Sequence, residues 1–124
     1  MGLVFEEKTF AIRGVIFEVY REMGPGFLES VYQECVEQEL TRKGIPFRSK
    51  PDLVLFYKDR PLEQNFRPDL VCYDQIILEL KAVKAIGPEH RAQLLNYLRA
   101  SKLRLGLLVN FGSHPKAEIE RYLL

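Results

Sequence analysis

The chain has only two cysteines in 124 residues, and no hydrophobic run of membrane-spanning length. Cys35 and Cys72 do not have the spacing of a metal-binding pair, so we expect reduced thiols, as in a cytoplasmic protein. No apolar segment approaches the roughly 20 residues that cross a bilayer, and the N-terminus lacks the basic segment and apolar core of a secretory signal. Repeats and low-complexity segments are also missing. These absences exclude a disulfide-stapled, zinc-finger or membrane-spanning protein.

A net charge of +1 conceals an uneven distribution along the chain. Residues 1–40 carry eight acidic and three basic side chains, which gives −5, whereas residues 41–124 carry fifteen basic and nine acidic ones, which gives +6. A basic region around an acidic cluster suits a phosphate-rich polymer that approaches through a metal ion. Unequal charges that merely solvate different faces of the protein explain the same distribution, and both interpretations stay open.

The hydrophobic spacing predicts one mixed α/β domain over residues 1–124, with a central mixed β-sheet flanked by helices. The expected order is ααβββαβα: helices at 5–23 and 27–43, strands at 45–57 and 62–67, a hairpin over 67–83, a helix at 89–101, a strand at 104–111 and a last helix at 116–122. In the first helix, Phe10, Val15, Ile16, Val19, Tyr20 and Met23 are expected to share the apolar face.

The hairpin carries the most informative residues. Strand side chains alternate between faces, so Glu79 and Lys81 point the same way, and hairpin pairing brings Asp69 to the level of Glu79. Two like charges about 4 Å apart repel by roughly 4 kcal/mol at an effective dielectric constant near 20. A divalent cation between the carboxylates removes this penalty. The pattern therefore points to metal-assisted chemistry.

Two helices contribute further candidate residues. Glu29 and Tyr32 are three residues apart and share a helix face, although an acidic residue in a first helical turn is also commonplace. His90, Gln93 and Tyr97 fall on one polar face of the helix at 89–101. For each of these residues alone, an ordinary solvated surface or a helix cap is a sufficient explanation.

Taken together, these pieces resemble the PD-(D/E)xK nuclease superfamily, and specifically the small GxxExxY proteins. Gly26, Glu29 and Tyr32 match the pattern that names the GxxExxY family. Pro68-Asp69 followed by Glu79-Leu80-Lys81 matches the superfamily signature, and Gln93 with Tyr97 matches the helical motif of the RecB-like branch. The resemblance covers essentially the whole chain and implies a restriction-endonuclease-like core.

The resemblance also implies roles for individual residues. Asp69 and Glu79 would bind Mg²⁺ or Mn²⁺, with the backbone carbonyl of Leu80 as a further ligand and Glu29 completing the acidic pocket directly or through water. Lys81 would orient or activate the attacking water. Gln93 and Tyr97 would steady the Lys81 region or bind the nucleic-acid backbone, and Tyr32 would act similarly. Apart from the resemblance, basic residues near the expected entrance are candidates for binding phosphates, such as Lys84, Arg91, Arg99 and Lys102. The implied reaction is hydrolysis of nucleic acid, with DNA favoured.

Two other functions remain open from the sequence. The domain could bind nucleic acid or a partner protein without cleaving, because no helix-turn-helix, zinc finger or other base-reading element is present. Specificity would then come from a homodimer or a partner protein. A purely structural ion-pair network is the third interpretation, although buried ion pairs are a poor device for stability alone.

Overall fold

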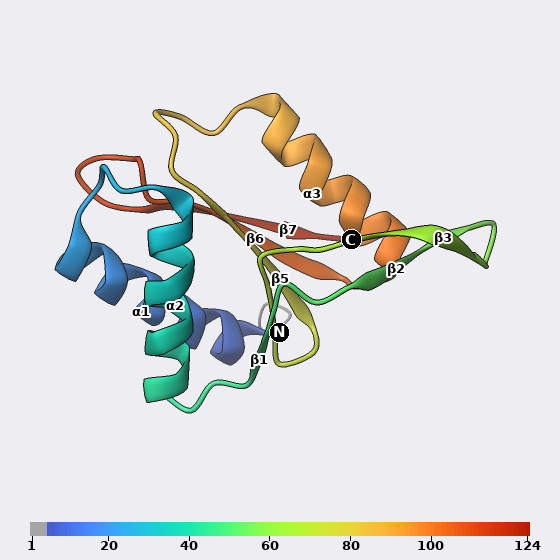
Figure 1. Ribbon diagram of the computed structural model, residues 1–124, viewed down its shortest axis with the longest axis horizontal. Helices are drawn as coiled ribbons and strands as arrows, with labels where there is room; N and C mark the ends of the chain where they lie inside the picture. Colours follow the sequence, from blue (N-terminus) through green and yellow to red (C-terminus); the bar gives the residue numbers. More distant parts are fainter. Residues whose placement is uncertain (1–4) are drawn as a thin grey trace.

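The computed structural model describes residues 5–124 and confirms a central mixed sheet with helices on both faces (Figure 1). The helices are α1 (Glu6–Met23), α2 (Glu29–Arg42) and α3 (Pro88–Ser101). The strands are β1 (Phe47–Ser49), β2 (Leu53–Tyr57), β3 (Arg60–Phe66), β4 (Leu70–Cys72), β5 (Ile76–Lys81), β6 (Leu105–Asn110) and β7 (Glu118–Leu123). The predicted element order is matched in outline.

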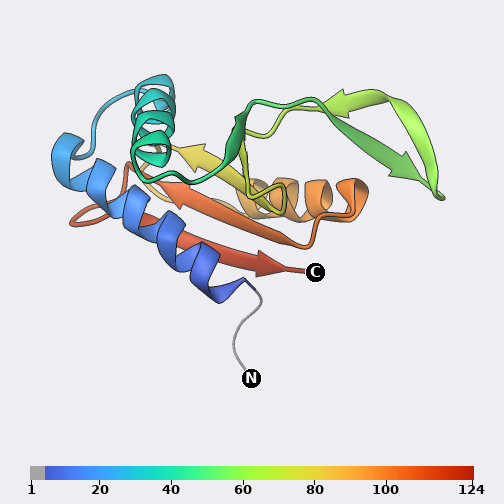
Figure 2. The same ribbon diagram turned by 90° about the horizontal axis from the view of Figure 1, so that it is seen from below.

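The main sheet has the strand order β1-β4-β5-β6-β7. Only β5 and β6 pair in parallel within it, and α3 provides the crossover that a parallel pair requires. Strands β2 and β3 form a separate two-stranded ribbon that projects away from the sheet (Figure 2).

Strand β5 is buried on both faces of the sheet, which explains its nearly continuous apolar sequence. Its residues Ile76, Leu78 and Leu80 belong to the core beneath α1 and α2. Ile77 belongs to the second core, where Leu94 and Leu98 of α3 pack. Glu79 and Lys81 alternate with the first set and so extend from the α3 face of the sheet.

The helix ends follow from local sequence. Helix α1 ends at Gly24, whose positive φ of 67° is readily adopted by glycine and whose N–H bonds to the carbonyl of Tyr20. Helix α3 begins after Gly87 with Pro88 at a first-turn position, where the missing N–H costs nothing.

Two predictions about elements are wrong. Residues 116–122 do not form a helix, because β7 pairs antiparallel with β6 over six residues and satisfies the backbone groups on the free side of that buried strand. Phe10 does not join the apolar face of α1: it is 79% exposed, and Ile12 occupies the core instead.

Residues 1–4 lie outside the described part of the chain. The predictions that the domain begins at residue 1 and that the N-terminus lacks a signal segment partly concern these residues. Within residues 5–124, no helix has the length and apolar character needed to cross a membrane.

Candidate active site

The hairpin of β4 and β5 brings Asp69 beside Glu79, as its sequence predicts. Leu70 is paired with Leu78, so the preceding Asp69 lies level with Glu79. The strands are joined by Tyr73, Asp74 and Gln75, and the first two of these residues have positive φ values (57° and 56°) that a short hairpin turn uses. The Asp69 carboxylate accepts a hydrogen bond from the backbone N–H of Leu80 at 2.7 Å, which fixes its orientation.

Glu79 is a buried carboxyl group in an unfavourable environment for a negative charge. The residue is 8% exposed, and its Oε1 atom has no hydrogen-bond partner among the described residues. Burial and the neighbouring Asp69 raise the pKa of Glu79 to about 8, although Lys81 offsets part of this increase. A negative charge on Glu79 is therefore disfavoured unless a positive charge compensates it.

Lys81 lies at the end of β5, where the backbone is held by two neighbouring segments. Its carbonyl accepts a hydrogen bond from Phe111 N at 2.8 Å. The fully buried Asn110 accepts a hydrogen bond from Val83 N (3.0 Å) and donates one to Val83 O (2.9 Å). Sequence reasoning gave Asn110 no role, although one polar residue at the end of an apolar strand is a usable signal.

Gln33 of α2 is a second residue that the sequence did not single out. Its Nε2 atom donates hydrogen bonds to the carbonyl oxygen of Asp69 (2.9 Å) and to the carboxylate of Glu37 (2.8 Å). Glu37 in turn accepts a hydrogen bond from Ser49 Oγ at 2.7 Å. The network anchors Asp69 from the opposite face of the sheet. Its sequence signal is the i,i+4 spacing from Glu29 to Gln33.

Glu29 lies at the start of α2 and faces the same small cavity as Asp69. The cavity has a volume of about 110 Å³. It is lined by Glu29, Ser30, Gln33, Lys50, Asp69 and Leu80. Glu29 itself is exposed to solvent. The structure thus brings Glu29 to the cavity that Asp69 lines, whereas Glu79 does not line this cavity.

Helix α3 brings Tyr97 to the same region. Its ring stacks on Phe66 with centroids 4.0 Å apart, and its hydroxyl accepts a hydrogen bond from Gln93 Nε2 at 2.9 Å. Burial, and then the negative charge of Glu79, raise the pKa of Tyr97, which shows that the two groups are electrostatic neighbours. Gln93 is exposed and is linked to the site through Tyr97.

Tyr32 and His90 have structural roles. Tyr32 is fully buried and stacks on Phe111 with centroids 4.3 Å apart, and its hydroxyl donates a hydrogen bond to the carbonyl of Gly24. It therefore fixes the connection between α1 and α2. His90 Nδ1 accepts a hydrogen bond from Gly87 N at 3.0 Å, so the capping explanation holds for this residue.

Two of the four predicted phosphate-binding residues are engaged elsewhere. Arg91 makes a two-pronged ion pair with Glu120 of β7, at 2.8 and 2.9 Å. Lys102 pairs with Asp59 at 2.9 Å. Lys84 and Arg99 remain exposed.

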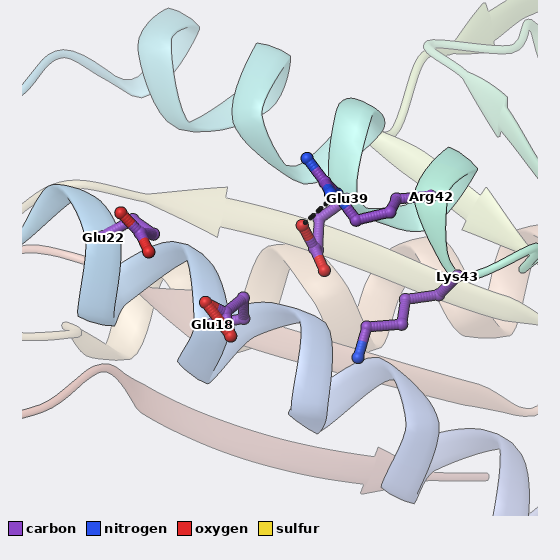
Figure 3. A pocket seen from close by; sticks show the side chains of 5 residues that line it. All are labelled: Glu18, Glu22, Glu39, Arg42 and Lys43. Carbon is purple, nitrogen blue, oxygen red and sulfur yellow. Dashed lines mark ion pairs between the residues drawn. The ribbon is translucent and has the colours of Figure 1, made fainter.

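A larger pocket lies away from these residues, between α1 and α2 (Figure 3). It has a volume of about 600 Å³ and is lined by Glu18, Glu22, Glu39, Arg42 and Lys43. Its side chains are long and charged, and Arg42 pairs with Glu39 at 3.5 Å across a mainly exposed surface. None of these side chains has a buried polar atom without a hydrogen-bond partner, so the size of the pocket alone does not make it the active site.

The carboxylate pair fits a hard divalent cation. The unpartnered Oε1 atom of buried Glu79 beside Asp69 is the main observation in favour, because a cation would compensate both charges. Among residues 5–124, no group of three His, Cys, Asp or Glu side chains is arranged to hold a metal ion. A cation would thus rely on two carboxylates, a backbone carbonyl and water, which is the usual coordination of Mg²⁺ rather than of Zn²⁺.

Comparisons with known proteins bear on the family and the fold of the chain. A family model described as the PD-(D/E)XK nuclease superfamily matches residues 6–122. A solved structure titled "Crystal structure of SSO0001" is similar with a TM-score of 0.59 and 15% identity, over 76% of this chain. The match spans 48% of that other chain, and at this identity the likeness concerns the fold alone. No curated protein matches the sequence.

Proposed function

Because the chain belongs to the PD-(D/E)XK nuclease superfamily, we propose that it is a metal-dependent nuclease acting on DNA through Asp69, Glu79 and Lys81. The observation that carries this proposal is the buried Glu79 carboxyl beside Asp69, whose Oε1 atom has no hydrogen-bond partner among the described residues. Gly26, Glu29 and Tyr32 further support placing it among the GxxExxY proteins. A cytoplasmic location, and a homodimer or partner protein that supplies specificity, belong to the same proposal.

In this proposal Asp69 and Glu79 hold Mg²⁺ or Mn²⁺, with the Leu80 carbonyl as third oxygen ligand and Glu29 acting through water. The bound cation would supply Lewis-acid stabilisation of the scissile phosphate. Lys81, which extends from the same sheet face as Glu79, orients the attacking water and offsets negative charge on the phosphate. Tyr97 closes the α3 side of the site and Gln93 holds its hydroxyl. Gln33 and the Leu80 N–H keep Asp69 in place.

The direct test is cleavage of end-labelled single-stranded DNA, duplex DNA and RNA, with Mg²⁺, Mn²⁺ or EDTA. Wild-type protein is expected to cleave DNA only with metal, and Lys81→Ala is expected to lower the rate by about 100-fold, the usual contribution of a positioned proton-transfer group. Lys43→Ala, at an exposed position just after α2, is the matched control. Cleavage by Lys81→Ala at the wild-type rate would exclude this site. Binding to DNA without cleavage, with every metal, would favour the non-catalytic module.

Gln33→Ala is expected to weaken metal binding although it does not remove a metal ligand. Without the hydrogen bond to the Asp69 carbonyl, the backbone at Asp69 is held less firmly. Groups that hold metal ligands in place typically contribute 10–100-fold to the affinity for the metal. We expect the metal concentration for half-maximal cleavage to rise about tenfold. Gln38→Ala, at an exposed position of the same helix, should behave as wild type. An unchanged metal dependence in Gln33→Ala would show that Asp69 is held without this network.

A further inference from the structure

The two-stranded ribbon of β2 and β3 continues the strands that carry the site. We call residues 50–67 the arm. Ser49 pairs with Leu70 on the sheet side, and Leu53 pairs with Phe66 on the arm side, so the register is the same before and after the interruption. Pro51 and Pro68 stand opposite each other in this register and lack N–H donors, which interrupts the ladder. The arm thus begins directly beside Asp69.

The arm extends past the body of the molecule, beyond the end of α3 (Figures 1 and 2). Its root is part of the core: Phe66 is buried, and Leu53 and Leu55 pack against the same cluster beneath α3. The tip belongs to neither core cluster. Along β3, every residue from Arg60 to Asn65 is exposed. Stability therefore explains the root of the arm but not the composition of its tip.

The charges of the arm leave an excess of free cations. Asp52 is paired with Arg67 at 2.6 Å, and Asp59 is paired with Lys102 at 2.9 Å. In the described chain, three basic residues of the arm have no acidic partner, against one such acidic residue. These are Lys50, Lys58 and Arg60, against Glu63. Lys50 lines the Asp69 cavity, whereas the other two cations lie at the tip.

The tip also presents an aromatic ring. Tyr57 is 64% exposed, and the Lys58 ammonium lies 5.5 Å from its ring centroid. Arg60 is the strand partner of Tyr57, so two cations flank one exposed ring. The cations are suited to the phosphates of a nucleic-acid backbone and are unsuited to a basic or purely apolar partner.

We propose that the arm binds the phosphate backbone of a DNA duplex whose scissile strand lies at Asp69 and Glu79. This inference rests on the proposed function and assigns the substrate of that same site as double-stranded. Five strand residues at about 3.3 Å each give the arm a reach of roughly 16 Å, which corresponds to several base pairs. A two-stranded ribbon also fits the roughly 12 Å width of the major groove. Lys50 holds the duplex near the cut, and Lys58 and Arg60 hold it farther away.

The test measures binding to duplex DNA as a function of salt concentration, in the Glu79→Gln background so that the DNA stays intact. Removing two phosphate contacts with Lys58→Ala/Arg60→Ala should make the slope of log affinity against log salt less negative by about 1.8. The matched control is Arg13→Ala/Lys43→Ala, which removes two positive charges from α1 and the end of α2 and should leave the slope unchanged. Equal thermal melting of all variants confirms folding.

Equal salt slopes for the arm variant and its control would overturn the proposal. A change of slope that occurs with single-stranded DNA or RNA but not with duplex DNA would also overturn it. Cleavage is measured separately with the wild-type background. A salt slope that depends on the arm, in a protein that cleaves no substrate, would support DNA binding by the arm and contradict the proposed nuclease activity. Metal-dependent cleavage with a salt slope that does not depend on the arm would support the nuclease activity and contradict DNA binding by the arm.

Discussion

Glu79→Gln is expected to abolish metal-dependent cleavage and at the same time to stabilise the metal-free protein. The amide is nearly the same shape but cannot provide a negative charge to a cation, so we expect cleavage to fall by about 1000-fold, the upper range for loss of one preorganised electrostatic group. The stabilisation arises because wild-type Glu79 is buried beside Asp69 with an unpartnered oxygen. Function and stability are thus opposed at this residue.

The pH dependence of this stabilisation follows from the raised pKa. The pKa of Glu79 is about 8 in the folded protein, against its ordinary value of 4.5. Between these pH values the folded state holds a proton that the unfolded state has lost, so the free energy of unfolding falls as pH rises and levels off above about 8. The slope is at most about 1.4 kcal/mol per pH unit. The free energy of unfolding of Glu79→Gln should not decline in this way. The difference in stability in favour of Glu79→Gln should therefore grow to a few kcal/mol at high pH.

The measurement is urea unfolding of both proteins in EDTA at pH 5, 7 and 9. Glu89→Gln, at an exposed position in the first turn of α3, is the control and should show no comparable growth of the difference with pH. Adding Mg²⁺ should stabilise wild type and not Glu79→Gln, since a ligand stabilises only the state that binds it. A Glu79→Gln protein less stable than wild type at pH 9 would contradict the assignment of Glu79 as an uncompensated buried charge.

The sequence was sufficient to predict the pairing of Asp69 and Glu79, because strand alternation and a tight turn are local properties. It was insufficient for Gln33, because the partner of this side chain is a backbone carbonyl 36 positions away. For the same reason Asn110 was given no role, and Tyr32 was given a role at the site and not at the connection between α1 and α2. Both residues bond to backbone atoms whose positions depend on the assembled fold.

The incorrect helix at 116–122 has a related cause. Ile119, Tyr122 and Leu123 do not alternate strictly with polar residues, so the short segment carries no clear strand pattern. Its conformation is set by the free hydrogen-bonding edge of β6, which exists only once the sheet has formed. Similarly, the positions of Pro51 and Pro68 opposite each other follow from the register of β1 with β4 and of β2 with β3.

Gly112→Ala is expected to cause the largest loss of stability of any small substitution near the site. A Cβ atom at Gly112 would lie 2.2 Å from Val83 O and 2.7 Å from Val83 N, and backbone atoms cannot turn aside as a side chain can. Gly112 N also donates to Asn110 Oδ1 at 2.9 Å, and this same oxygen accepts from Val83 N. The methyl group would therefore force apart the segments that fix the end of β5.

We expect Gly112→Ala to lower the free energy of unfolding by about 2–4 kcal/mol, in the range of overpacked buried positions. Thermal melting measures this loss, and Gly14→Ala is the matched control. Gly14 lies in the middle of α1, where an added Cβ meets nothing within 4 Å, so alanine should stabilise that helix by up to about 1 kcal/mol. Because Phe111 N bonds to Lys81 O, any Gly112→Ala protein that folds should also cleave more slowly than wild type. Wild-type melting and cleavage in Gly112→Ala would mean that the contact with Val83 does not position Lys81.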